Sequence, residues 1–263
     1  MNPKAILARA GLSAPEPTPL GGGDLSRVYR AGNYVIKTRT PPVPGMFAAE
    51  AAGLEALRRR GVRVPRVIWV GEEGLVLEYL PPGPPDWAGL GEMVAGLHRQ
   101  RGAAYGWDRP AFLGPFAFGK REDGDWKAHY RWRLEKLIAA TPRLGDLGEK
   151  ILLAVGKASL PLEGPAPLHG DLWSGNVHMS QEGPALLDPA FLHGERGLDL
   201  AMMQLFGGFP EAFWRAYEAL YPIPPELEAA LPCYQLYYLL VHVHFFGAGY
   251  LASLKNTLRR CPG

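Results

Sequence analysis

In the first eighty residues, hydrophobic and polar positions alternate over short runs, with one longer stretch of helical spacing between them. The runs 25–31 and 33–38 are joined by Gly32-Asn33, a dipeptide typical of the tight turn of a β-hairpin. From 47 to 60, apolar residues recur every three or four positions, which predicts an amphipathic helix. Two more apolar runs follow, separated by a Glu-Glu-Gly turn. This part of the chain is therefore predicted to be a small antiparallel sheet with one helix packed on it.

The pattern changes after a break at 81–86, which begins with PPGPP, a sequence typical of a semi-rigid linker. Beyond the break, three segments have apolar residues spaced by three and four, as helices do. The only strand-like interruption expected there lies around 166–190. We predict an α+β fold of two lobes with the chemistry in the cleft between them. The N-terminal lobe is expected at 1–80, the linker at 81–86, the larger, mainly helical lobe at 87–263, and its first three helices at 89–100, 125–140 and 147–158.

Composition and charge exclude several classes of protein. With 47% hydrophobic and 21% charged residues among 263, the chain is typical of a globular protein rather than a disordered one. The net charge of +2 gives no general attraction to nucleic acid or to an anionic membrane. The uncharged segment 233–254 is long enough to cross a bilayer, but Gln235, His242 and His244 interrupt it. We expect a buried helix there, and no membrane or nucleic-acid partner.

Two features bear on the cellular compartment. Cys233 and Cys261 are the only cysteines, too few for a disulfide framework or a thiolate metal site. The N-terminal residues lack the apolar run of roughly 7 to 15 residues that a secretion signal needs. The protein is therefore expected in the cytoplasm.

The segment HGDLWSGNV, residues 169–177, carries a carboxylate, an indole, a hydroxyl and a carboxamide on one loop. Asp171 and Asn176 are five positions apart, and Asp188 follows at the end of a short apolar run. Phosphoryl transfer needs a base for the incoming hydroxyl and oxygen ligands for Mg²⁺. The spacing predicts Asp171 as the base, with Asn176 and Asp188 as metal ligands.

A phosphate-binding cation is expected from the N-terminal lobe. Lys37 ends an aliphatic strand, and Glu50 shares the apolar stripe of the helix that follows. A buried carboxylate costs several kcal/mol unless it is paired, so we predict an ion pair between Lys37 and Glu50. The alternative is that Glu50 lies at the margin of the stripe, in water.

The order of these features along the chain is that of the kinase-like fold. A glycine-rich turn comes first, then the strand lysine, the helix glutamate and a hinge segment, and finally the Asp-x4-Asn loop and the strand-end aspartate. The turn contains Gly22 and Gly23, and the hinge consists of Glu78, Tyr79 and Leu80.

Within that fold, HGDLWSGN followed by LLDPA and by HGERGLDLAMMQLFGGF resembles the fructosamine kinase family, also called ketosamine kinases, which is related to the aminoglycoside phosphotransferases. The resemblance covers nearly the whole chain and is specific at 169–176 and 194–209. It implies an ATP-dependent, Mg²⁺-requiring kinase that phosphorylates the sugar 3-hydroxyl of ketosamines such as fructosamines and ribulosamines. In that family the 3-phosphate is unstable and is lost with the sugar, so the reaction repairs glycated amines.

The resemblance also implies a role for individual residues. Asp171 would accept the proton, Asn176 and Asp188 would hold magnesium, and Lys37 with Glu50 would position the phosphates. The remaining roles are ATP contacts for the backbone of Gly22, Gly23, Glu78, Tyr79 and Leu80, and support of the catalytic loop for His169 and Asp199.

Independent features of the sequence indicate a small acceptor. Only ten residues separate Asp188 from Asp199, too few for the activation segment and peptide platform of a protein kinase. Trp173 follows the expected base by two positions, so we predict that its indole faces the acceptor. Trp126 is a second candidate for substrate contact, and core packing is its alternative.

Three other functions are considered. A kinase of the same fold for an aminoglycoside or choline-like amine predicts an acidic acceptor pocket, for which the only acidic cluster in reach is Glu122, Asp123 and Asp125. A catalytically dead, nucleotide-binding scaffold would usually have lost one of the four central residues, and all are present. A metal-dependent hydrolase would use His169, Asp171, His178 and Asp188, but it would leave Asn176 and Lys37 without roles. The expected partner is a glycated amine, free or protein-bound; the sequence predicts no oligomeric state.

Overall fold

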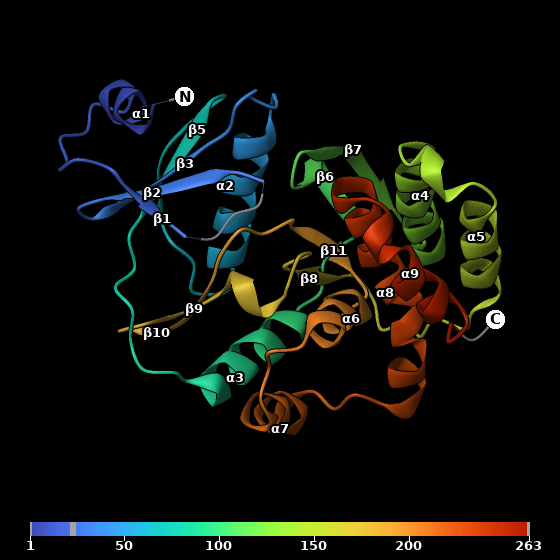
Figure 1. Cartoon of the computed structure of the whole chain (residues 1–263). Helices are drawn as coiled ribbons and strands as arrows, with labels where there is room; N and C mark the ends of the chain where they lie inside the picture. The colour runs from blue at the N-terminus through green and yellow to red at the C-terminus, as the bar shows by residue number, and fades with distance from the viewer. Residues whose placement is uncertain (1, 22–24, 262–263) are drawn as a thin grey trace.

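The computed structural model describes residues 2–21 and 25–261, and its N-terminal lobe is a five-stranded antiparallel sheet (Figure 1). The strands lie in the order β1-β2-β3-β5-β4, and helix α2 (Met46–Arg58) contacts β4 and β5. The predicted hairpin is confirmed, with Gly32 at φ +60° in its turn, a backbone conformation that favours glycine. The strands are β1 (Thr18–Leu20), β2 (Arg27–Ala31), β3 (Tyr34–Thr38), β4 (Val67–Gly71) and β5 (Gly74–Glu78).

One N-terminal element was not predicted. Helix α1 (Pro3–Arg9) begins after Asn2, whose side chain accepts a hydrogen bond from the backbone of Lys4. Its residues Ile6 and Leu7 are buried in a small second core with strand residues such as Ile36. The lobe therefore has two helices rather than one.

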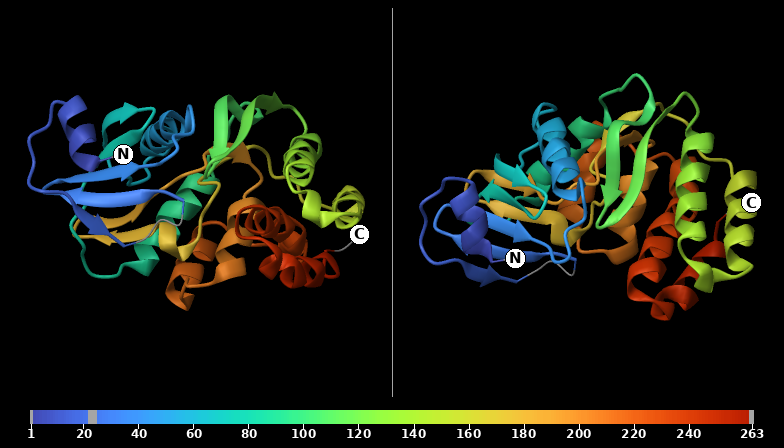
Figure 2. Two further views of the ribbon diagram at one scale, coloured as in Figure 1. Left: turned by 45° about the horizontal axis from the view of Figure 1, so that its top comes forward. Right: turned by 90° about the horizontal axis from the view of Figure 1, so that it is seen from above.

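The C-terminal lobe is mainly helical, as predicted, and the three expected helices are confirmed (Figure 2). Helix α3 packs against α7, and α6 packs against α8. The helices are α3 (Trp87–His98), α4 (Trp126–Ala139), α5 (Leu147–Lys157), α6 (Gly197–Phe206), α7 (Glu211–Leu220), α8 (Pro225–Phe246) and α9 (Leu251–Leu258), with short 3₁₀ turns at Pro142–Leu144, Ser174–Asn176 and Ala248–Tyr250.

The expectation of a single strand-like interruption in this lobe is wrong. A long hairpin of β6 (Tyr105–Leu113) and β7 (Phe116–Asp123) joins a four-stranded sheet in the order β7-β6-β11-β8. Its register shifts twice, and Pro110 and several glycines hide the alternation that marks a regular strand. The region 166–190 does hold strands, as predicted. They are β8 (Ala166–Leu168), β9 (Val177–Ser180) and β10 (Gly183–Leu186), and β11 (Leu192–Gly194) follows them.

The proline-rich linker runs along β9. The backbone N–H of Gly83 donates to Met179 at 2.8 Å, and that of Gln181 donates to Pro81 at 3.0 Å. A Cβ atom on Gly83 would lie 2.4 Å from the carbonyl oxygen of Ser180, so the approach requires glycine. The connection between the lobes is therefore held against β9, the strand that follows the loop 169–176.

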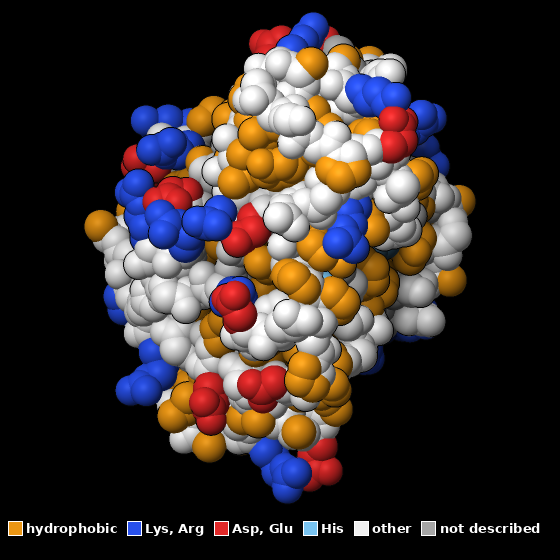
Figure 3. All heavy atoms as spheres, turned by 90° about the vertical axis from the view of Figure 1, so that its left-hand side faces the viewer, with side chains coloured by type: hydrophobic (Ala, Val, Ile, Leu, Met, Phe, Trp, Pro, Cys, Tyr) orange, Lys and Arg blue, Asp and Glu red, His pale blue; other side chains and the backbone are white. Residues whose placement is uncertain are grey.

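The predicted buried helix is confirmed only for the first part of the apolar segment, because residues 233–241 are buried but Phe246 is exposed and most residues after it are exposed or half-buried. Helix α8 ends at Phe246, and Gly247, at φ +88°, starts a turn that leads into α9. Among the described residues no helix combines the length and the apolar character needed to span a bilayer. Cys233 and Cys261, too few for a framework, form one disulfide that ties α8 to the end of the chain. On the face seen in Figure 3, acidic and basic side chains are interspersed, in keeping with the small net charge.

Candidate active site

The predicted ion pair between Lys37 and Glu50 is present, and Asp188 joins it. The Nζ atom of Lys37 lies 2.6 Å from Oε1 of Glu50 and 2.8 Å from Oδ1 of Asp188. The Lys37 side chain is 6% exposed and that of Glu50 is 12% exposed, so the alternative of a solvated Glu50 is excluded. Strand β3, helix α2 and the loop after β10 thus bring together three residues that are up to 151 positions apart, from 37 to 188.

Burial and charge act against each other in this triad. Burial alone would lower the pKa of Lys37, but attraction to Asp188 and Glu50 outweighs it and raises the pKa above its ordinary value, so the ammonium stays charged. Burial raises the pKa of Glu50 to about 7, with Lys37 opposing the rise and Asp188 adding to it. Asp188 has a φ of +55°, a strained value for a residue other than glycine, and such strain is typical of functional sites.

Asp171 and Asn176 lie on one loop and contact each other. The side-chain amide of Asn176 donates to the backbone oxygen of Asp171 at 2.8 Å and to its Oδ2 at 3.3 Å. Because the amide nitrogen is used within the loop, the Oδ1 atom of Asn176 remains as an acceptor. Burial raises the pKa of Asp171 to about 7, the charges of Asp188 and Asp199 add to the rise, and the Asn176 amide opposes it. A carboxylate with such a pKa is matched to base catalysis near neutral pH.

The loop that carries Asp171 and Asn176 is held in place by Asp199, at the start of α6. Its two carboxylate oxygens accept the backbone N–H groups of His169 and Gly170, both at 2.8 Å, and the side chain is fully buried. The imidazole of His169 bonds the carbonyl of Leu187 at 2.7 Å through Nε2, which ties the catalytic loop to the residue before Asp188. Asp199 and His169 therefore both hold the loop by hydrogen bonds.

Two residues that support the loop were not found from the sequence. His98 on α3 places Nε2 3.2 Å from the carboxylate of Asp199 and Nδ1 2.9 Å from the hydroxyl of Tyr217. The hydroxyl of Tyr238 on α8 donates to the backbone oxygen of Gly170 at 2.9 Å. The only sign of His98 in the sequence is its place on the buried side of α3.

The hinge offers fewer hydrogen-bond donors than expected. The backbone N–H of Glu78 donates to Arg66 and that of Tyr79 donates to Asn33, each at 2.9 Å. The carbonyl oxygen of Leu80 is also engaged, 2.9 Å from Nε2 of His178. The N–H of Leu80 is left as the hinge donor that has no protein partner in the described part of the chain. Gly22 and Gly23, the other predicted ATP contacts, lie outside the described residues.

The two candidate tryptophans differ in their environment. The side chain of Trp173 is 40% exposed and packs over Gly175, where a Cβ atom would lie 2.3 Å from the indole. Trp126 is fully buried, donates from Nε1 to the hydroxyl of Tyr234 at 3.0 Å and stacks on Tyr130. The prediction that Trp126 contacts a substrate is therefore wrong, because the indole belongs to the core of the helical lobe.

The donor set fits a magnesium nucleotide better than a hydrolytic metal centre. Within residues 2–21 and 25–261, no three His, Cys, Asp or Glu side chains gather closely enough to hold a metal ion by themselves. The imidazoles of His169 and His178 are engaged with backbone carbonyls. Magnesium commonly takes one or two protein oxygens and completes its shell with phosphates and water. The Asn176 and Asp188 oxygens meet that requirement.

The comparisons with known proteins agree with this geometry. A family model described as fructosamine kinase matches residues 8–262. A protein from Thermus thermophilus named as a probable ketoamine kinase is 60% identical over 261 residues, covering 98% of this chain and 99% of the relative. A crystal structure from Thermobifida fusca of a candidate fructosamine-3-kinase is 30% identical, with a TM-score of 0.83 and 98% of both chains covered.

A more distant structure shares the fold alone. The aminoglycoside phosphotransferase APH(2")-IIa, in a ternary complex with streptomycin and ATP, superposes with a TM-score of 0.68 at 14% identity, covering 99% of this chain and 97% of that one. The two-lobed, kinase-like fold predicted from the sequence is therefore confirmed.

Proposed function

We propose that this chain, which belongs to the fructosamine kinase family, transfers the γ-phosphoryl group of ATP to the sugar 3-hydroxyl of ketosamines. The family establishes an ATP-dependent kinase, and the acceptor and its hydroxyl are the proposal. The observation that carries it is the convergence of Lys37, Glu50 and Asp188 beside a catalytic loop that holds Asp171 and Asn176.

In this proposal the N-terminal lobe binds and orients the nucleotide. An ammonium group has three donors, and Glu50 and Asp188 occupy two of those of Lys37, so the third is available for a phosphate oxygen. The Leu80 N–H would bond the adenine edge. Gly22 and Gly23 would let backbone N–H groups approach the phosphates. Magnesium, held by Asn176 Oδ1 and Asp188, would neutralise charge on the phosphates.

The C-terminal lobe provides the base and the acceptor surface. Asp171 would accept the proton of the attacking hydroxyl, while Asp199 and His169 keep the loop in place. Trp173 would stack on the sugar or on the amine-bearing part of the acceptor. Loss of the unstable 3-phosphate from the product would then release the amine, which is a deglycation. Cytoplasmic location and the absence of a nucleic-acid partner stay predictions.

The alternative acceptors are less well supported. The acidic cluster 122–125, which the sequence suggested for an aminoglycoside or choline pocket, is largely engaged within the protein. Asp123 bonds Arg121 at 2.6 Å and His129 at 2.8 Å, and Asp125 caps helix α4. A dead scaffold is disfavoured because the four central residues are present and those of the ion-pair triad are in contact.

An acceptor screen tests the proposal. Release of ADP from Mg·ATP is measured with fructosyl-lysine, ribulosyl-lysine, an aminoglycoside and choline, using Asp171→Asn as the inactive control. We expect turnover with a ketosamine, and a kcat for Asp171→Asn lower by a factor of about 10² to 10⁴. Turnover with the aminoglycoside or choline but with neither ketosamine would reject the proposed acceptor.

A further inference from the structure

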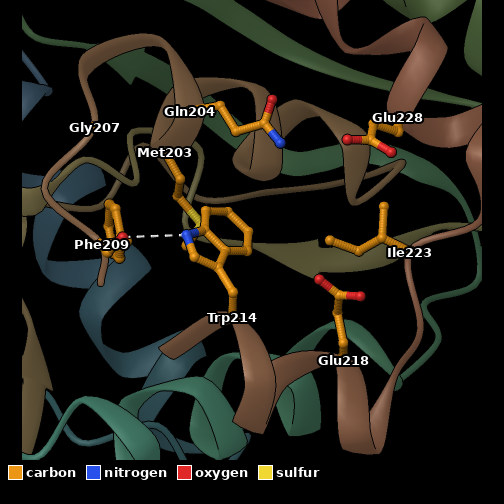
Figure 4. Close-up of a pocket in the computed structure, with 8 residues that line it drawn as sticks. All are labelled: Met203, Gln204, Gly207, Phe209, Trp214, Glu218, Ile223 and Glu228. Atoms are coloured by element: carbon orange, nitrogen blue, oxygen red, sulfur yellow. Dashed lines mark hydrogen bonds between the residues drawn. The ribbon is translucent and has the colours of Figure 1, made fainter. Parts of the chain in front are cut away.

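A cavity outside the active site lies between α6, α7 and the start of α8 (Figure 4). Its volume is about 540 Å³, and none of its lining residues belongs to the set assigned to ATP, magnesium or the base. It combines an apolar wall with two carboxylates. Neither the proposed reaction nor the packing of the lobe explains this combination.

The apolar wall consists of Phe209, Trp214 and Ile223. The indole N–H of Trp214 donates to the backbone oxygen of Phe209 at 3.2 Å, so its hydrogen-bonding capacity is used. Figure 4 shows the six-membered ring of this indole pointing into the cavity, away from that bond. An indole face attracts cations, and an aliphatic stem packs well against such a surface.

The charged part of the cavity consists of Glu218 on α7 and Glu228 on α8, both exposed. Among the residues that the structure describes, neither forms an ion pair, whereas Glu211 on α7 lies 3.6 Å from Arg215. The lining contains no lysine, arginine or histidine. Charge complementarity therefore favours a positively charged occupant with an apolar stem.

The rim of the cavity touches the catalytic loop. Gly207 lines the cavity, and a Cβ atom on the next residue, Gly208, would lie 2.4 Å from Oγ of Ser174. Both glycines have positive φ, at +68° and +88°. Ser174 follows Trp173, so the rim of the cavity lies beside the part of the loop that carries the proposed acceptor contact.

We infer that this cavity binds the side chain of a lysine in a peptide- or protein-bound acceptor, near the glycated amine that reacts at Asp171. This inference rests on the proposed function, because it assigns the acceptor to the polypeptide class. The lysine stem packs on Trp214 and Ile223, and its ammonium lies between Glu218 and Glu228. Protein-bound ketosamines in lysine-rich sequences are then better acceptors than the free glycated amine.

Equilibrium binding tests the site without any phosphoryl transfer. An unglycated, end-blocked peptide of alternating glycine and lysine is titrated while the NMR signal of the Trp214 indole N–H is followed. Its twin has norleucine in place of lysine. We expect the lysine peptide to bind about three- to tenfold more tightly than its twin, because each exposed ion pair and a cation over an indole contribute modestly.

The double variant E218Q/E228Q should lose this preference. Its matched control is E211Q/E226Q, which removes one carboxylate from each of the same two helices outside the cavity and should keep the preference. Equal affinity for the two peptides in the wild type, or a lysine preference that persists in E218Q/E228Q, overturns the inference. So does a concentration-dependent dimer that E218Q/E228Q abolishes, since the occupant is then a second copy of this chain.

The proposed function and the inference fail in different ways. If no ketosamine is phosphorylated but the lysine preference is present and depends on the two glutamates, the acceptor assignment is wrong and the site stands as a cation site. If ketosamines are phosphorylated without any lysine preference, the kinase stands and the inference is wrong. With glycated peptides, the inference further predicts that E218Q/E228Q raises KM for lysine-rich acceptors and leaves kcat unchanged.

Discussion

The substitution Asp199→Asn tests how strongly Asp199 holds the catalytic loop, through its effects on the free energy of unfolding and on kcat. The buried carboxylate accepts the N–H groups of His169 and Gly170 through separate oxygens and also contacts His98. An asparagine keeps one acceptor oxygen and turns an NH₂ group toward the other backbone donor. At least one buried N–H is therefore left unpaired, and a charge-assisted bond is lost.

An unpaired buried donor costs about 1–3 kcal/mol, and bonds to a charged group contribute more than neutral ones. We expect Asp199→Asn to lower the free energy of unfolding by about 2–4 kcal/mol. Because Gly170 precedes the base, the loop should also shift, and a displacement on the order of 1 Å costs roughly 10²-fold in kcat. Urea unfolding and steady-state kinetics measure the two effects.

The control is Asp146→Asn, an exposed aspartate whose side chain makes no capping bond. It should change stability by less than about 0.5 kcal/mol. If Asp199→Asn matched this control in both stability and kcat, the loop would not depend on Asp199.

Asp188 and Asp171 give three further predictions. Asp188→Ala should abolish Mg²⁺-dependent binding of ATP, which calorimetry with and without Mg²⁺ measures; unchanged affinity for Mg·ATP would contradict its role as a ligand. Because the pKa of Asp171 is raised to about 7 and a base must be ionised, kcat/KM should fall tenfold per pH unit below about pH 7, and a flat profile would contradict this. Because the pKa of Asp171 is raised in the folded protein, ionisation of this carboxyl destabilises the fold as the pH rises from its ordinary pKa in the unfolded chain to about 7. Asp171→Asn should therefore raise the free energy of unfolding by about 1–2 kcal/mol at about pH 8 and have little effect near pH 4. Urea titrations at the two pH values measure the difference.

The features predicted from the sequence are those that leave a local pattern. The β2–β3 hairpin has a turn dipeptide, α2 has a helical period, and Glu50 is conspicuous because it interrupts an apolar stripe. The cost of burying Glu50 was enough to predict its ion pair with Lys37, whereas the contact between Lys37 and Asp188 was not predicted.

The features that were missed depend on distant partners. The β6–β7 hairpin has an irregular register and contains a proline, and its pairing with β11 joins Gly106 to His193, far along the chain. His98 and Tyr238 reach the catalytic loop from helices on either side of it in sequence, and no spacing rule connects them to Asp199 or Gly170. Trp126 and Trp173 have the same chemistry, and only the packing of α4 against Tyr234 distinguishes the buried one.

The central claim concerns which atom receives the phosphoryl group, and phosphorus NMR of the reaction with fructosyl-lysine and Mg·ATP tests it most directly. We expect a new phosphate resonance coupled to the proton on carbon 3 of the sugar, followed by its decay with release of free lysine. With Asp171→Asn the resonance should not form on the same time scale. A phosphate on another hydroxyl, or ATP consumption with no sugar phosphate at all, would contradict phosphorylation at the 3-hydroxyl.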